Sequence, residues 1–285
     1  MMKSVMAVLS GVSVLTLGAC QKSESTTNET TNTTTTTTTT SASSAGDING
    51  TWVADLASVQ IDAKPDQYLL NGGKFSCPTC TPPLTLAADG AFHAVTGRPY
   101  ADEMSVKADD DHNVTRNARK GGRDTGQTKY SVSADGKTLT VSFTDSSTPN
   151  VKPVTGNYTE TRVAAGPAGS NAISGSWKLD KYTNISQEGL TVTYKVDGDT
   201  LHMSSPAGTS YDAKLDGTDA PIKGDIGGTT ASVKKLADGS YEETDKRGGK
   251  VISVTTFTTG ADGKMHVVNA DKQSGTTVKY DANKQ

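Results

Sequence analysis

The chain has little of several residue types that would point at once to a function. Only three of its 285 residues are cysteine, 5% are aromatic and 33% are hydrophobic. Because globular chains usually have an apolar fraction of roughly 45–50%, any core is expected to be thin. Lys and Arg total 28 against 31 for Asp and Glu, giving a net charge of -3. That balance excludes the strongly basic surface typical of nucleic-acid-binding proteins, so no nucleic acid is expected as a partner.

Motifs for catalysis and metal binding are also missing. The chain contains no P-loop, no Gly-x-Ser-x-Gly and no His-Glu-x-x-His pattern. The acidic run at 109–111 lacks the spacing of a calcium-binding loop. Its four histidines occupy positions that do not correspond between the two halves of the chain described below: His93, His112, His202 and His266. We therefore expect a non-enzymatic protein with no catalytic residues, metal or cofactor.

Residues 1–19 have the pattern of a secretory signal peptide. Lys3 supplies a positive charge, and the apolar run that follows is shorter than the roughly 20 residues of a membrane-spanning helix. The run ends in Leu17-Gly18-Ala19-Cys20, which resembles the lipobox of bacterial lipoproteins. The resemblance implies cleavage before Cys20, acylation of that residue and anchorage in a membrane through its acyl chains. Gln21, where aspartate would imply retention at the inner membrane, implies the outer membrane, with the protein facing the periplasm.

Residues 20–46 predict a lipidated cysteine followed by a disordered tether. The segment has no aromatic residue and contains an unbroken threonine run from Thr33 to Thr40. A stretch with so few apolar side chains cannot bury a core, and threonine disfavours helices. Fully extended, the tether would reach at most about 90 Å.

The remainder of the chain is an internal duplication. Ile48-Asn49-Gly50-Thr51-Trp52 matches Ile173-Ser174-Gly175-Ser176-Trp177, and these segments hold the only two tryptophans. Further pairs match at one constant offset (232 − 105 = 127 residues): Ser105-Val106-Lys107 with Ser232-Val233-Lys234, and Ala134-Asp135-Gly136-Lys137 with Ala261-Asp262-Gly263-Lys264. We therefore predict two homologous domains, at 47–164 and 173–285, with a small-residue linker at 165–172.

Each copy reads as all-β. Asp-Gly and Gly-Gly pairs, which suit tight hairpins, recur between short alternating runs such as Leu139-Thr140-Val141-Ser142-Phe143. Consecutive hairpins of short strands predict an up-and-down antiparallel barrel of about eight strands in each copy, because closure removes exposed edges.

Gly50-Thr51-Trp52 and Gly175-Ser176-Trp177 resemble the Gly-x-Trp of the first strand in lipocalins and their calycin relatives. The resemblance implies that a basic residue of the last strand packs across each tryptophan and closes the barrel: Arg162 over Trp52, and Lys279 over Trp177. It also implies a binding module that holds a small apolar ligand or lipid. The alternative is a structural or interaction protein of the envelope, with solid barrels that bind a protein or glycan through their surfaces.

Cys77-Pro78-Thr79-Cys80 is the one sharp motif in the body of the chain. Outside the inner membrane a disulfide between Cys77 and Cys80 is the expected state. Two other interpretations remain open. The pair could act as a redox-active dithiol, although its flanks read as strand and turn rather than as a helix N-terminus. It could also bind a metal with His93, although no fourth ligand has suitable spacing.

The lipobox generates the first prediction. Cells grown with a labelled palmitate analogue should label the wild-type protein, and Cys20→Ala should abolish the label, because the thiol is the acceptor of the acyl group. Labelling is read by gel fluorescence. A Cys77→Ala/Cys80→Ala variant is the control and should keep its label. Retention of label by Cys20→Ala would refute the assignment.

Overall fold

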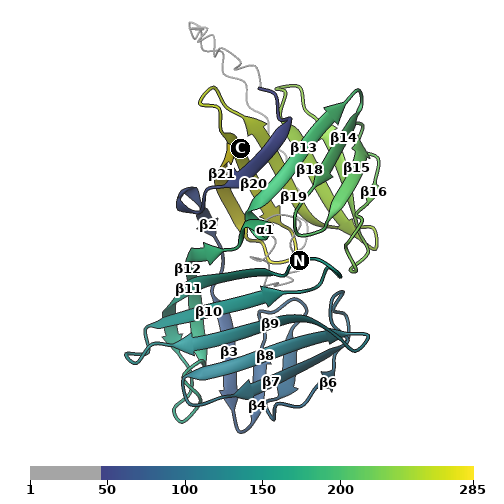
Figure 1. Ribbon diagram of the computed structural model, residues 1–285. Coiled ribbons are helices and arrows are strands. Elements are labelled where there is room, and N and C mark those ends of the chain that lie inside the picture. The colour runs from purple at the N-terminus through teal and green to yellow at the C-terminus, as the bar shows by residue number, and fades with distance from the viewer. Residues whose placement is uncertain (1–45) are drawn as a thin grey trace, which may run out of the picture.

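The computed structural model describes residues 46–285. The expected signal peptide, Cys20 and the threonine-rich tether lie outside the described residues. Nearly all of the described chain is β-structure, arranged as two barrel-like bodies placed end to end (Figure 1). The prediction of two tandem antiparallel all-β barrels is confirmed.

The first body, barrel 1, is a ten-stranded sheet with the order β5-β4-β3-β12-β11-β10-β9-β8-β7-β6. Its strands are β3 (Asp66–Asn71), β4 (Lys74–Cys77), β5 (Leu84–Ala87), β6 (His93–Ala94), β7 (Glu103–Ala108), β8 (Asn113–Lys120), β9 (Arg123–Val132), β10 (Thr138–Asp145), β11 (Val154–Ala165) and β12 (Gly175–Ile185).

The second body, barrel 2, is an eleven-stranded sheet with the order β15-β14-β13-β1-β21-β20-β19-β18-β17-β16, to which β2 adds by pairing with β21. Its strands are β1 (Gly50–Ala54), β2 (Gln60–Asp62), β13 (Thr191–Asp197), β14 (Thr200–Ser204), β15 (Ser210–Lys214), β16 (Ala220–Pro221), β17 (Thr229–Lys235), β18 (Tyr241–Arg247), β19 (Lys250–Thr259), β20 (Met265–Asp271) and β21 (Thr277–Lys284).

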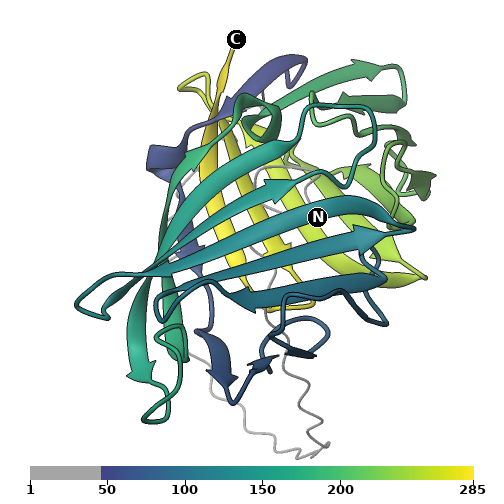
Figure 2. The same cartoon turned by 60° about the horizontal axis from the view of Figure 1, so that its bottom comes forward.

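Both sheets curl until their edges nearly meet. Single bridges join the segments that follow β5 and β15 to a strand near the other edge of the same sheet: Asp89 with Lys107 in barrel 1, and Asp216 with Lys234 in barrel 2. These bridges lie at the same offset as the sequence repeat. Figure 2 shows the strongly curved blue and teal strands of barrel 1 in front of the yellow strands of barrel 2.

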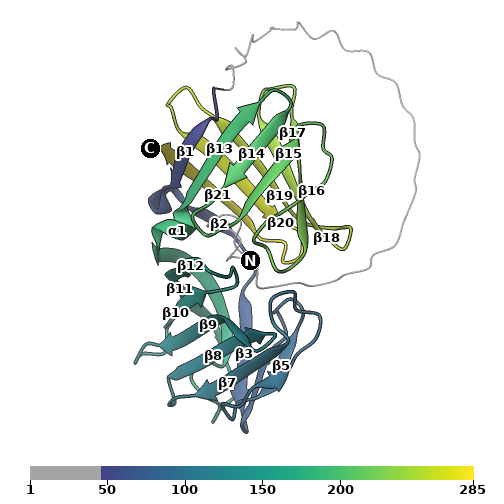
Figure 3. The ribbon, with the colours of Figure 1, turned by 45° about the vertical axis from the view of Figure 1, so that its right-hand side comes forward.

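The two tryptophan-bearing strands are exchanged between the barrels. β1, which carries Trp52, lies between β13 and β21 in barrel 2 (Figure 3). β12, which carries Trp177, lies between β11 and β3 in barrel 1. The polar residue after each buried isoleucine makes an equivalent contact across the exchange: Asn49 Oδ1 accepts the N–H of Val196 (2.6 Å), and Ser174 Oγ accepts the N–H of Leu70 (2.9 Å).

This exchange corrects the expected domain boundaries of 47–164 and 173–285. Barrel 1 is continuous from β3 to β12, whereas barrel 2 combines β13–β21 with β1 and β2 from the start of the described chain. The expected linker at 165–172 is instead the turn between β11 and β12 within barrel 1. The repeat identifies the tryptophan strands, but the two barrels have equivalent gaps, between β3 and β11 and between β13 and β21. Sequence periodicity therefore does not specify which strand fills which gap.

Each barrel has a closed end and an open end. At the closed end the tryptophan side chain plugs the barrel, and its indole N–H donates to a backbone carbonyl: Trp52 to Ile48 and Trp177 to Ile173, both at 2.8 Å. The open ends carry the Gly-Gly hairpins that join β8 to β9 and β18 to β19. The chain passes between barrels at the open ends, once through residues 63–65 and once through the short helix α1 (Gln187–Leu190).

Each barrel has an apolar core made by alternate residues of its strands. The core of barrel 2 also takes in side chains of barrel 1, namely Val154, Tyr182 and Ile185. This shared apolar cluster fixes the open ends against each other.

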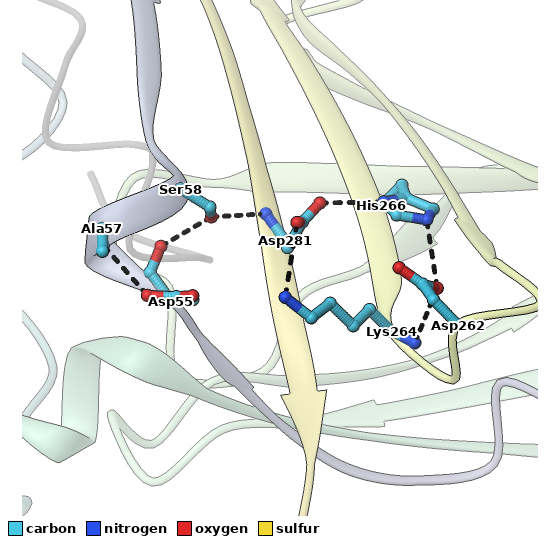
Figure 4. A network of polar contacts seen from close by, with 7 residues as sticks. All are labelled: Asp55, Ala57, Ser58, Asp262, Lys264, His266 and Asp281. Atoms are coloured by element: carbon cyan, nitrogen blue, oxygen red, sulfur yellow. Dashed lines mark hydrogen bonds and ion pairs between the residues drawn. The ribbon is translucent and has the colours of Figure 1, made fainter.

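A polar cluster fastens the N-terminal segment to the last strand of barrel 2 (Figure 4). Ser58, in the 3-10 helix η2 (Leu56–Ser58), donates its hydroxyl to the carbonyl of Asp55 (2.7 Å) and accepts the N–H of Asp281 (2.8 Å). His266 Nδ1 lies 2.8 Å from Asp281 Oδ1, and its Nε2 lies 3.4 Å from Asp262 Oδ1. These contacts join η2 to β21 and β20, so the ends of the described chain close barrel 2 together.

The exchange generates the second prediction. A fragment of residues 64–186 should unfold cooperatively on its own, because it contains every strand of barrel 1. A fragment of residues 187–285 should show no cooperative transition until a peptide of residues 46–63 supplies β1 and β2. Urea denaturation followed by circular dichroism measures both. The matched control is the peptide with Trp52→Ala, which should restore much less structure; folding of 187–285 without any peptide would contradict the exchange.

Candidate functional site

A cavity of about 450 Å³ lies where the open ends of the two barrels meet. Its walls are the inner faces of β7–β10 of barrel 1 and of β17–β20 of barrel 2, together with the loop at 97–101. Inward-facing residues reach this space because strand side chains alternate between the inside and the outside of the barrel. We call this cavity the chamber.

One side of the chamber is sealed by a contact between the barrels. Tyr100, on the loop between β6 and β7 of barrel 1, donates its hydroxyl to Asp225 Oδ1 of barrel 2 (2.7 Å). Arg247 of β18 donates to the same hydroxyl (2.8 Å), and its guanidinium lies 5.2 Å from the Tyr100 ring centroid. Burial, followed by the charge of Asp225, raises the pKa of Tyr100, so the phenol remains a donor at neutral pH.

The barrel 1 wall of the chamber is basic. Arg98 from the loop and Arg116 from β8 both line it, and Arg116 also stacks near the Tyr130 ring at 5.6 Å. Burial, followed by the charge of Arg116, lowers the pKa of Arg98 to about 10. Burial alone would lower the pKa of Arg116, but its ionisable neighbours, led by Tyr130 and including Asp66, raise it. Both guanidinium groups are therefore charged at neutral pH.

The barrel 2 wall is acidic. Glu243 and Asp245 of β18 and Asp271 of β20 are all buried and line the chamber. Glu243 accepts the hydroxyl proton of Tyr211 (2.7 Å), and Asp245 accepts that of Ser253 (2.9 Å). Asp271 accepts backbone N–H groups of the turn that follows it. The chamber is thus polarised along the line that joins the two barrels.

A buried pair of carboxyl groups lies inside barrel 1, close to Arg116. Glu160 of β11 is 1% exposed, and neither of its carboxyl oxygens receives a hydrogen bond from a donor group within the described chain. Its hydrogen-bonding neighbour is the carboxyl of Asp66, at the start of β3. Two carboxylates cannot hydrogen-bond each other unless one holds a proton. The pair is therefore expected to share a proton.

The pKa values of this pair follow from the same geometry. Burial raises the pKa of Asp66 to about 7, although Glu160, Thr79 and Arg116 favour its charged form. Burial and the neighbouring Asp66 raise the pKa of Glu160 well above its usual range. The pair carries at most one negative charge at neutral pH, because Asp66 is only partly ionised near its pKa and Glu160 holds its proton.

The disulfide predicted between Cys77 and Cys80 is present, with a Cα–Cα distance of 5.3 Å. It closes a loop after β4, not a helix N-terminus, and both cysteines are buried. The loop places Thr79 between two groups of β3: its hydroxyl accepts the N–H of Gln67 (2.9 Å) and lies 3.5 Å from Asp66 Oδ1. The geometry favours a structural role, in which the disulfide positions a hydroxyl beside the carboxyl pair.

The basic residues expected across the tryptophans are found in a different arrangement. Arg162 packs over Trp177 with its guanidinium carbon 3.9 Å from the ring centroid, and Lys284 packs over Trp52 at 5.5 Å. The expected pairing of Arg162 with Trp52 is wrong because β12, not β1, lies beside β11. Lys279 is also wrong, since it is exposed and pairs in register with Gln60 of β2, while Lys284 lies opposite Trp52. Each cation–π contact is worth about 0.5–2 kcal/mol.

Within residues 46–285 the histidines do not form one site. His93 contacts Asp89, His202 contacts Asp212, and His266 faces two carboxylates, each on a different part of the surface. No set of three His, Cys, Asp or Glu side chains in this range is arranged to hold a metal ion. The ring of His112 donates through Nδ1 to the backbone carbonyl of Val132 (3.1 Å).

Sequence reasoning missed the chamber residues and the carboxyl pair. One signal was available: Arg116, Glu160, Glu243 and Asp245 are charged residues at inward positions of alternating strands, where apolar residues are expected. Arg98 gave no such signal because it lies on a loop.

No family model, curated protein or solved structure matches this chain. In the part of the chain that the structure describes, none of the helices is long and apolar enough to cross a membrane.

The carboxyl pair generates the third prediction. Folding raises the pKa of both groups, so the folded state holds protons more tightly than the unfolded state, and the pair's contribution to stability falls as pH rises from about 4 through 7. Glu160→Gln removes the like charge and keeps the shape. It should raise the free energy of unfolding by about 1–3 kcal/mol at pH 8 and change it little at pH 5.

Urea denaturation at the two pH values measures this difference. Glu242→Gln, on the outer face of β18, is the matched control and should shift both values equally. Parallel pH profiles for Glu160→Gln and wild type would show that the pair does not share a proton in the folded state.

Proposed function

We propose that this protein is a lipid-anchored, non-enzymatic binding protein of the bacterial cell envelope that holds one small organic ligand between its two barrels. The observation that carries the proposal is the chamber of about 450 Å³ at the junction of the open ends. Binding sites for small molecules are typically concave and combine apolar surface with a few placed polar groups. The chamber has this mixture, with Met104, Ala118 and Phe143 beside charged side chains.

The position of the chamber refines the expected ligand and its site. The closed half of each barrel is filled by side chains, including Trp177 and Leu139 in barrel 1 and Trp52 and Tyr211 in barrel 2, all at most 1% exposed. This packing leaves room for a ligand at the mouths, not in two separate barrel interiors. The charged walls favour a ligand with a polar head over a purely apolar one, and a lipid has such a head.

Two further observations support a binding role and an anchor. Among residues 46–285, no histidine or cysteine lines the chamber, so Ser253, whose hydroxyl donates to Asp245, has no histidine base beside it there. The described chain begins at the closed end of barrel 2, where the N–H of Gly46 donates to the carbonyl of Thr259 (3.3 Å). A tether attached there would hold the closed end of barrel 2 towards the membrane. The chamber, at the open end of barrel 2, would then face away from the membrane.

The fourth prediction tests the chamber as a ligand site. Protein purified from a periplasm as Cys20→Ala should retain a bound small molecule in native mass spectrometry. Adding Ala118→Phe, on the inner face of β8, should lower the bound fraction at least tenfold because the ring fills part of the chamber. Ala164→Phe, at an exposed position of β11, is the control and should keep the ligand. Equal occupancy in both variants would place the ligand elsewhere.

A further inference from the structure

Two of the three arginines that line the chamber, Arg98 and Arg116 on the barrel 1 wall, form an unbalanced cationic site. Arg98 donates a hydrogen bond to the carbonyl oxygen of Pro82, and Arg116 donates to the hydroxyl of Thr128 (3.2 Å). Both acceptors are neutral. In the described residues no carboxylate forms a salt bridge with either guanidinium. Two like charges thus face one cavity, each repelling the other.

The carboxyl pair inside barrel 1 balances the charge of Arg116 only in part. Asp66 acts on Arg116 from inside barrel 1, but it belongs to the pair with Glu160, which carries at most one charge for two carboxyl groups. Asp145 also lines the barrel 1 side of the chamber, where its carboxylate accepts the N–H of Ser147 at 2.8 Å. Burial makes an uncompensated charge costly, so an anion entering the chamber would stabilise this wall.

The opposite wall fixes where an anion can lie. Glu243, Asp245 and Asp271 repel negative charge from barrel 2, so an anionic group is directed towards Arg98 and Arg116. Apolar surface adjoins the arginines on the barrel 1 side, supplied by Pro82, Pro99, Met104 and Phe143. The same wall can therefore hold both a charged head and an apolar portion.

We infer that the ligand of the chamber is a small amphiphilic organic anion whose carboxylate or phosphate head is bound by Arg98 and Arg116. Guanidinium groups recognise both heads through paired N–H donors, so the two share one chemistry. The inference rests on the proposed function, since it names the chemical class that the chamber takes.

Calorimetric titration of the unlipidated Cys20→Ala protein with dodecanoate, dodecyl phosphate and dodecanol tests the inference. At least one of the two anions should bind ten times or more tighter than dodecanol, and the tighter of them identifies the head group. Adding Arg98→Gln should weaken binding of that anion about tenfold and leave dodecanol unchanged. Arg98→Lys should fall between, because an ammonium lacks the paired donors.

Lys178→Gln is the control, because it removes one positive charge at an exposed position of β12 and should leave both affinities unchanged. Arg116→Gln should act like Arg98→Gln; if it fails to fold, Arg98→Gln alone decides. Dodecanol binding as tightly as the anions, or Arg98→Gln weakening both equally, would overturn the anionic ligand while the chamber stays a binding site. Failure of all three probes to bind, together with a bare mass in native mass spectrometry, would overturn the proposed function and this inference together.

Discussion

The exchange of the two tryptophan strands is the constraint on which the rest of the structure depends. β1 fills the gap between β13 and β21, and β12 fills the gap between β3 and β11, so the backbone groups of both find partners on both sides. Each exchanged strand must then leave its barrel at the open end and cross to the other one. Two short crossings hold the mouths face to face, and the chamber exists because those mouths meet.

The duplicated frame is symmetric, but its inner chemistry is not. At one register position of the repeat, barrel 1 has Arg116 where barrel 2 has Glu243, and at the next inward position Ala118 corresponds to Asp245. The carboxyl of Glu160 has an alanine, Ala282, near its equivalent place in barrel 2. Strand order and closure therefore come from the copied sequence, whereas the polarity of the chamber comes from substitutions made after copying.

Local signals predicted the elements well because hairpins and alternation are decided by neighbouring residues. The Gly-Gly and Asp-Gly turns, the duplication and the Cys77–Cys80 disulfide all follow from short-range patterns. The exchange does not, because β1 and β12 carry the same motif and fit equivalent gaps. The chamber was also out of reach, since its walls bring together Arg98, on a loop of barrel 1, and Arg247, on a strand of barrel 2 that lies 149 residues later (247 − 98).

The buried carboxyl pair has a role in this arrangement despite its cost. The pair offers at most a single negative charge to Arg116, which leaves the positive charge of Arg98 unmatched on the chamber side. A second carboxylate charge would neutralise the wall, and two neutral groups would leave Arg116 buried without a counterion. An anion bound to the guanidinium of Arg116 would compete with Asp66 for that positive charge. It would therefore favour protonation of the carboxyl pair. In the proposed complex, ligand binding at the mouth and proton binding inside barrel 1 would be linked through Arg116.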